Sequence, residues 1–143
     1  MEYLHVHDKI VRDALAASHG REVKHTGDGI MASFTSAAAA VRCASQIQQE
    51  LARRERELED QMPLKVRIGG GAGEPVEKNQ DIFGTTVQLA ARLCSHAEPN
   101  QILVSNVIAE LCLGKGLRFR GLGEVSLRGF DKPVHVHAVE WPV

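Results

Sequence analysis

Residues 23–34 are the stretch that most constrains the fold, because two short β-prone runs stand on either side of Gly27-Asp28. A glycine followed by an aspartate is typical of a tight turn between two antiparallel strands. The glycines at 27 and 29 also leave the backbone around Asp28 uncrowded. By itself this pattern favours a simple turn residue. The alternative is a carboxylate that binds a divalent cation together with phosphates.

The composition is that of a globular chain, with 43% hydrophobic and 24% charged residues among 143. This length predicts a single domain over residues 1–143 with its own core. A net charge of -1 gives no electrostatic reason to expect a nucleic-acid or membrane partner. Three widely spaced cysteines indicate free thiols and a cytoplasmic location. We expect no membrane segment and no signal peptide.

Helical and strand patterns alternate along the chain. They predict helices over residues 3–18, from Thr35 or Ser36 to about residue 60, over 85–97 and over 106–112. They predict strands in the hairpin over 22–34 and over 64–68, 101–105, 117–127 and 134–141. This order indicates an α/β sandwich with a mixed, mainly antiparallel sheet, one face of which is covered by helices.

Residues 69–73 are glycine at every position except Ala72. Such density permits either a flexible bend or the close approach of another backbone or of a ligand. It matches neither the dinucleotide fingerprint nor the P-loop, since no Lys-Ser/Thr pair ends it. Residues 74–80 are expected to form a polar connection.

The helix over residues 85–97 has two faces of different character. Its buried face is predicted to consist of Val87, Ala90, Ala91 and Cys94. Gln88 and Arg92 are four residues apart, so they share another face and can reach one target together. A polar pair at this spacing is more often simply solvated. His135 and His137 share one face of a strand, but no third ligand nearby suggests a zinc site.

Several segments taken together resemble the class III nucleotidyl cyclase homology domain. They are residues 24–29, 81–84, 87–92, 101–105 and 119–130, in the family's order and at its spacing. The family's enzymes convert ATP or GTP into the 3′,5′-cyclic nucleotide and pyrophosphate, and they work as dimers with the sites at the interface. The resemblance therefore implies a ferredoxin-like α/β sandwich and an adenylate cyclase catalytic domain that acts on ATP as a homodimer.

The same resemblance implies a role for each candidate site residue. Asp28 matches one of two aspartates that bind Mg2+ or Mn2+. Lys24 and Asp81 match the pair that reads adenine, since lysine can donate to a ring nitrogen and aspartate can accept from the exocyclic amine. Arg92 matches the arginine that neutralises charge on the phosphates. Gln88 stands where the family has an asparagine, so its amide lies one methylene further out.

The family's first strand carries the other metal-binding aspartate and normally precedes the first helix. This sequence starts almost at that helix, so we expect a fold that lacks the strand and a chain impaired in catalysis. The alternative hypothesis is a non-catalytic cyclase-like module that dimerises or binds nucleotide for regulation. An unrelated ferredoxin-like domain is disfavoured by the ordered set of motifs.

Overall fold

The computed structural model describes residues 2–26, 29–57, 65–73, 76–78 and 81–143. For residues 2–5, 26, 76–78 and 81–83 it describes the backbone alone. The chain divides into two compact units, essentially Met1–Val66 and Arg67–Trp141. We describe each unit by itself, and the expectation of a single domain stays a prediction.

The first unit contains two helices and a hairpin among its described residues. Its elements are α1 (Glu2–Ala17), β1 (Arg21–Thr26), β2 (Gly29–Ser33) and α2 (Ala37–Glu57). Strands β1 and β2 pair antiparallel, with Thr26 opposite Gly29, which confirms the predicted hairpin. The Ser36 hydroxyl accepts a hydrogen bond from the Ala39 amide at 3.1 Å, so Ser36 caps α2 as expected.

Helix α1 packs against α2 and forms the core of the first unit. Ile10, Ala14 and Leu15 of α1 are buried. For α2, the sequence places apolar residues at helical spacing at Ala40, Ala44, Ile47, Leu51 and Leu58. Ala44, Ile47 and Leu51 are buried and Ala40 is half-buried, whereas Leu58 lies outside the described residues. The 3.6-residue period therefore identified the side of α2 that meets the core.

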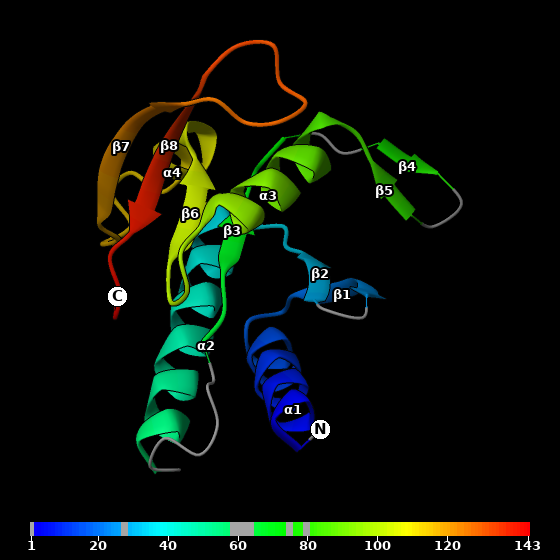
Figure 1. Ribbon diagram of the computed structural model, residues 1–143, viewed down its shortest axis with the longest axis vertical. Coiled ribbons are helices and arrows are strands. Elements are labelled where there is room, and N and C mark those ends of the chain that lie inside the picture. The colour runs from blue at the N-terminus through cyan, green and yellow to red at the C-terminus, as the bar shows by residue number, and fades with distance from the viewer. Residues whose placement is uncertain (1, 27–28, 58–64, 74–75, 79–80) are drawn as a thin grey trace. The chain divides into compact units, whose positions relative to one another are not determined.

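The second unit is built around a four-stranded sheet (Figure 1). Its elements are β3 (Ile68–Gly70), β4 (Val76–Lys78), β5 (Asp81–Phe83), α3 (Thr85–His96), β6 (Ile102–Ser105), α4 (Asn106–Leu111), β7 (Phe119–Val125) and β8 (Val134–Val139). The strand order is β3-β6-β8-β7, in which β3 is parallel to β6 and the other pairs are antiparallel. This arrangement confirms the predicted α/β fold with a mixed, mainly antiparallel sheet.

Two sequence predictions in this unit were wrong in detail. The strand expected over residues 64–68 begins only at Ile68, because its partner β6 offers pairing positions from Ile102 to Val104. The connection expected over residues 74–80 contains β4, which pairs antiparallel with β5. Both differences arise because a partner strand decides where a ladder lies, and single-chain periodicity does not contain that information.

The glycine run lies against the backbone of α3. A Cβ atom built on Gly69 would stand 2.2 Å from the Cys94 amide nitrogen and 2.5 Å from the Ala90 carbonyl oxygen. One built on Gly71 would stand 3.2 Å from the Thr86 carbonyl oxygen. These alternate glycines therefore allow a helix backbone to approach a strand closely, which is the second of the two predicted uses of the run.

The buried face of α3 differs from the predicted one. Leu93 is fully buried and Ala97, just after the helix, is nearly so, whereas Ala91 is exposed. Ala90 and Cys94 are half-buried against the glycine strand. Alanine buries so little surface that it is compatible with either face, and the larger leucine decides which row meets the core.

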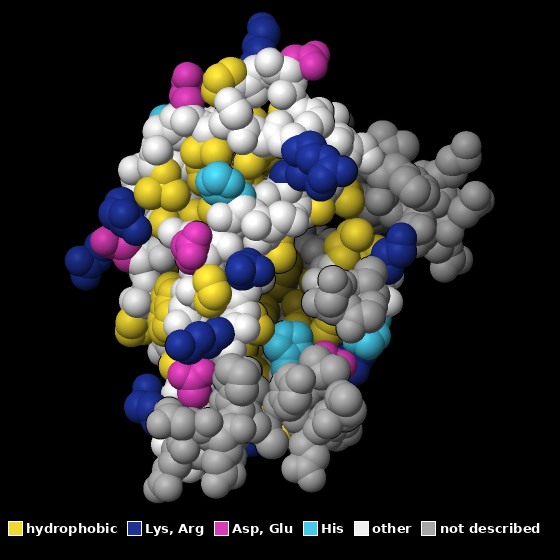
Figure 2. All heavy atoms as spheres, in the orientation of Figure 1, with side chains coloured by type: hydrophobic (Ala, Val, Ile, Leu, Met, Phe, Trp, Pro, Cys, Tyr) yellow, Lys and Arg dark blue, Asp and Glu magenta, His cyan; other side chains and the backbone are white. Residues whose placement is uncertain are grey.

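The surface gives two further observations. On the face shown in Figure 2, lysine and arginine side chains lie beside aspartate and glutamate in several places, so the described residues there do not form a surface of one sign. None of the helices in the described ranges combines the length and apolar character needed to span a bilayer.

The close approach of α3 to β3 predicts a graded response to alanine substitution. Gly69→Ala should lower the free energy of unfolding by about 3 kcal/mol, the upper end of the usual cost of overpacking, because its Cβ meets backbone that cannot rotate away. Gly70→Ala is the matched control, since its Cβ would lie 3.5 Å from Val104 Cγ1, an ordinary contact. Denaturant titration measures both, and equal effects would contradict the proposed packing.

Candidate active site

Helix α3 carries two of the candidate site residues on one face. The chain leaves β5 at Phe83 and enters α3 at Thr85 through Gly84 alone, whose φ of 125° favours glycine. The backbone N–H of Gln88 donates to the backbone carbonyl of Gly84 at 3.2 Å, which closes the first turn of the helix. The motif at residues 81–84 therefore couples the strand of Asp81 directly to the helix of Gln88 and Arg92.

The guanidinium of Arg92 is held by a turn in the connection between β7 and β8. Its Nε donates a hydrogen bond to the carbonyl oxygen of Arg128 at 3.0 Å. In this turn the Phe130 amide donates to the Leu127 carbonyl at 3.1 Å, and Gly129 has a φ of 91°. The half-buried Arg92 side chain thus has a fixed partner 36 residues away in the chain.

Gln88 reaches the same turn. A Cβ built on Gly129 would lie 2.7 Å from Gln88 Nε2, so the amide end of this side chain stands directly beside the glycine. The prediction that Gln88 and Arg92 can reach one target is confirmed, with the turn at residues 127–130 as that target. This turn lies in a segment of the family resemblance, but the sequence alone indicated no role for Arg128 or Gly129.

Lys24 is exposed on β1, beside a β-bulge that lies between Glu22 and Lys24. Helix α1 anchors this strand, because Arg12 Nε and Nη2 donate to the two carboxylate oxygens of Glu22 at 2.8 and 3.2 Å. This hydrogen-bonded pair lowers the pKa of Glu22 and raises the pKa of Arg12. His25 Nε2 lies 3.3 Å from Asp8 Oδ2 on the same helix. The strand that carries Lys24 is therefore tied to α1 through Glu22 and His25.

The remaining two predicted site residues are Asp28 and Asp81. Asp28 lies outside the described residues, and the Asp81 side chain is not among the described ones, although its backbone pairs with Lys78 in the β4–β5 hairpin. Within the described ranges, no three His, Cys, Asp or Glu side chains converge in a way that could hold a metal ion. Those residues do not by themselves make the oxygen-rich site that Mg2+ prefers.

Of the two histidines of β8, His137 joins β8 to α4 and His135 stacks on His137. The His135 and His137 rings stack with centroids 4.8 Å apart, and His137 Nε2 lies 2.8 Å from Asn106 Oδ1. Burial lowers the pKa of His137, which favours the neutral ring. The pair thus has a structural explanation within the second unit.

The comparison with protein families decides the identity of the domain. The chain matches the model of the adenylate and guanylate cyclase catalytic domain over residues 1–140. It belongs to this family. Cyclase domains of the family bind a nucleotide substrate, generally use divalent metal ions and work as dimers.

Solved structures of cyclase domains have the same fold. An adenylate/guanylate cyclase/hydrolase from Silicibacter pomeroyi is 35% identical, with a TM-score of 0.80 over 93% of this chain and 79% of that chain. An adenylyl cyclase from P. aeruginosa has a TM-score of 0.85 over 99% of this chain and 82% of that chain. At 23% identity, the second similarity is evidence for the fold alone.

Curated relatives of this cyclase domain are much longer proteins. A relative from Rhizobium meliloti is 34% identical over 130 residues, which cover 90% of this chain and 22% of that protein. The adenylate cyclase of Streptomyces coelicolor is 35% identical over 98 residues, which cover 68% of this chain and 24% of that enzyme. The chain therefore spans about a quarter or less of these two relatives.

Proposed function

We propose that this cyclase domain converts ATP into 3′,5′-cyclic AMP and pyrophosphate, as the catalytic part of an adenylate cyclase that acts in signalling. The observation that carries the proposal is the Arg92 guanidinium, which α3 and the turn at residues 127–130 hold beside Gln88 in a chain of this family. A fixed, always-charged fork suits the stabilisation of charge that develops on phosphates.

The roles of the site residues follow the family pattern. Lys24 and Asp81 read the adenine edge, and Arg92 binds the phosphates. Gln88 contacts the ribose with its amide. These four act in one protomer of a homodimer, and Asp28 acts from the other. A divalent ion bound there, Mg2+ or Mn2+, supplies charge neutralisation and activation of the attacking oxygen.

In the reaction, the ribose 3′-oxygen attacks the α-phosphorus in line with the leaving group. The bond between the 3′-oxygen and the α-phosphorus forms while the bond from that phosphorus to the bridging oxygen of pyrophosphate breaks. The hydroxyl proton leaves to solvent. Arg92 offsets the negative charge that moves onto the phosphate oxygens, and Gln88 holds the ribose so that the 3′-oxygen faces the phosphorus.

The first test is turnover by the 143-residue chain itself. We infer that residues 1–143 supply Asp28 but not the family strand that carries the other metal-binding aspartate, so we expect little cyclic AMP from ATP with either metal. Chromatography of the reaction products measures it. Robust turnover would contradict the assignment of the metal-binding residue.

A chain extended at its N-terminus by the family's first strand tests the proposal directly. We expect this extended chain to make cyclic AMP and pyrophosphate. ATP binding without any turnover by the extended chain would favour the alternative, a non-catalytic cyclase-like module that binds nucleotide for regulation.

Base choice is tested by Lys24→Glu combined with Asp81→Cys in the extended chain. Adenine presents a ring acceptor and an amine donor, whereas guanine presents a carbonyl and a ring N–H. Losing one buried hydrogen bond costs about 1–3 kcal/mol, so the ratio of kcat/KM for ATP to that for GTP should fall about tenfold or more.

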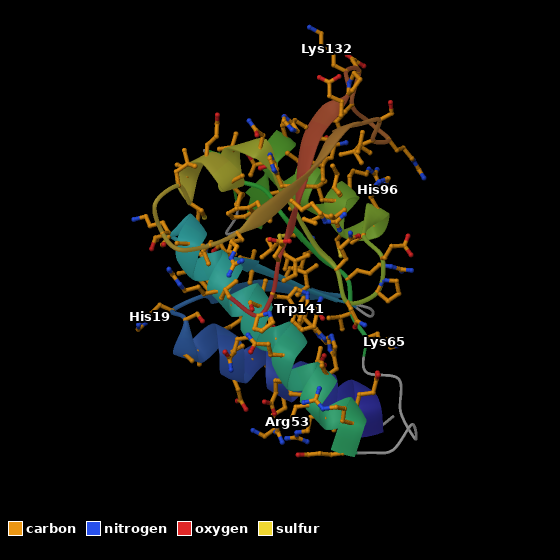
Figure 3. All side chains as sticks on the ribbon, turned by 90° about the vertical axis from the view of Figure 1, so that its left-hand side faces the viewer. His19, Arg53, Lys65, His96, Lys132 and Trp141 are labelled. Atoms are coloured by element: carbon orange, nitrogen blue, oxygen red, sulfur yellow. The ribbon has the colours of Figure 1, made fainter. Side chains whose placement is uncertain are left out.

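The matched control for base choice is Lys132→Glu. Figure 3 shows Lys132 at the outer end of the connection between β7 and β8, with its side chain pointing away from the ribbon. It carries the same charge change as Lys24→Glu and should alter ATP and GTP use equally. If Lys24→Glu with Asp81→Cys also alters kcat/KM for ATP and for GTP by the same factor, Lys24 and Asp81 do not read the base.

Assembly is the remaining part of the proposal. The hairpin of β1 and β2 and the segment over residues 81–92 should contact a second copy around a two-fold axis, because the proposed site draws groups from both protomers. We expect light scattering to report a concentration-dependent dimer, and a monomer at every concentration would count against the shared site.

A further inference from the structure

The turn at residues 127–130 has the geometry of a tight, glycine-dependent β-turn. The hydrogen bond from the Phe130 amide to the Leu127 carbonyl closes it, and Gly129 takes a φ of 91° at its third position. A positive φ at that position is the mark of type II turns, which therefore need glycine there. The Arg128 carbonyl takes no part in the closing bond and accepts from Arg92 instead.

Both ends of the turn are fixed in the core of the second unit. Leu127 is buried in the hydrophobic cluster that contains Leu93 of α3 and Val136 of β8. Phe130 packs against the same cluster. The turn consequently has little freedom to move relative to α3, and Figure 1 shows the orange connection that contains it reaching over this helix.

Helix α3 meets this fixed turn through two successive side chains of one row. Arg92 donates through Nε to the Arg128 carbonyl, and the Gln88 amide occupies the space that a Cβ at position 129 would need. The Nε bond orients the guanidinium plane. The Nη1 and Nη2 nitrogens are left out of that bond, and together they form the fork that binds a phosphate bidentately.

We propose that the turn at residues 127–130 is a positioning element of the nucleotide site, which holds the Arg92 guanidinium in the orientation that meets the phosphates. Gly129 is essential to it for two reasons, its positive φ and the reach of Gln88. The inference rests on the proposed role of Arg92, and it adds the turn and the Gln88–Gly129 contact to that role.

The contact is tested in the 143-residue chain by the exchange of the Arg92 Nε proton with water, followed by NMR. Its signal is assigned by its loss in Arg92→Lys. We expect exchange at least about tenfold slower than for the exposed Arg120, because a hydrogen-bonded proton must be released before it exchanges. Exchange as fast as that of Arg120 would overturn the proposal without any further variant.

Gly129→Ala and Gly123→Ala separate steric contact from backbone strain. Both glycines have positive φ, 91° and 79°, but a Cβ at Gly123 meets nothing within 4 Å. Slow exchange of the Arg92 Nε proton should be lost in Gly129→Ala and kept in Gly123→Ala. Adding Gln88→Asn to Gly129→Ala shortens the clashing side chain and should restore part of the protection. Unchanged exchange in Gly129→Ala would overturn the proposal.

Turnover of the extended chain tests the functional consequence. Gly129→Ala should lower kcat about tenfold or more and change KM for ATP little, since Arg92 acts on charge that develops in the transition state. Gly123→Ala should change neither kcat nor KM for ATP. Lost protection with unchanged kcat would overturn the positioning role and leave the proposed function intact. Absence of turnover in the unsubstituted extended chain would instead overturn the proposed function and the catalytic part of this inference.

Discussion

The close contact between α3 and the glycine strand is the constraint on which the second unit depends. Gly69 and Gly71 present no side chain to the helix, so the backbone at Ala90 and Cys94 lies where a Cβ would otherwise stand. Because the glycines set the distance, the row of α3 that contains Leu93 reaches the core formed with β6 and β8. The position of the helix, and of every polar side chain on it, follows from this packing.

The packing of α3 also fixes the candidate site residues on that helix. Gly84 joins β5 to α3 without a loop, and the core-anchored turn at residues 127–130 holds Arg92 from another side. Groups that act on a transition state are most effective when their orientation is set before the substrate arrives. An arginine whose Nε is already engaged loses less conformational freedom on binding a phosphate. This frame explains how an exposed helix face can carry the proposed chemistry.

Several features were predictable from the sequence because they depend on local patterns. Ser36 caps α2 and the hairpin pairs Thr26 with Gly29, as capping and turn chemistry indicate. The errors occurred where a neighbour decides the outcome. The register of β3 depends on β6, and the buried row of α3 depends on where Leu93 can reach the core, so an apolar Ala91 was assigned to the wrong face.

The sequence by itself determined the order of the helices and of the strands other than β4 and β5. It also determined the family resemblance and the candidates Lys24, Asp28, Asp81, Gln88 and Arg92, because these depend on residue types at short or fixed spacings. Only the tertiary structure decided that helix α3 packs closely against the glycine run, and that Gln88 and Arg92 contact the turn at residues 127–130. These contacts join residues between 15 and 41 positions apart in the sequence. They arise from the packing of whole elements, which no periodicity within one element encodes.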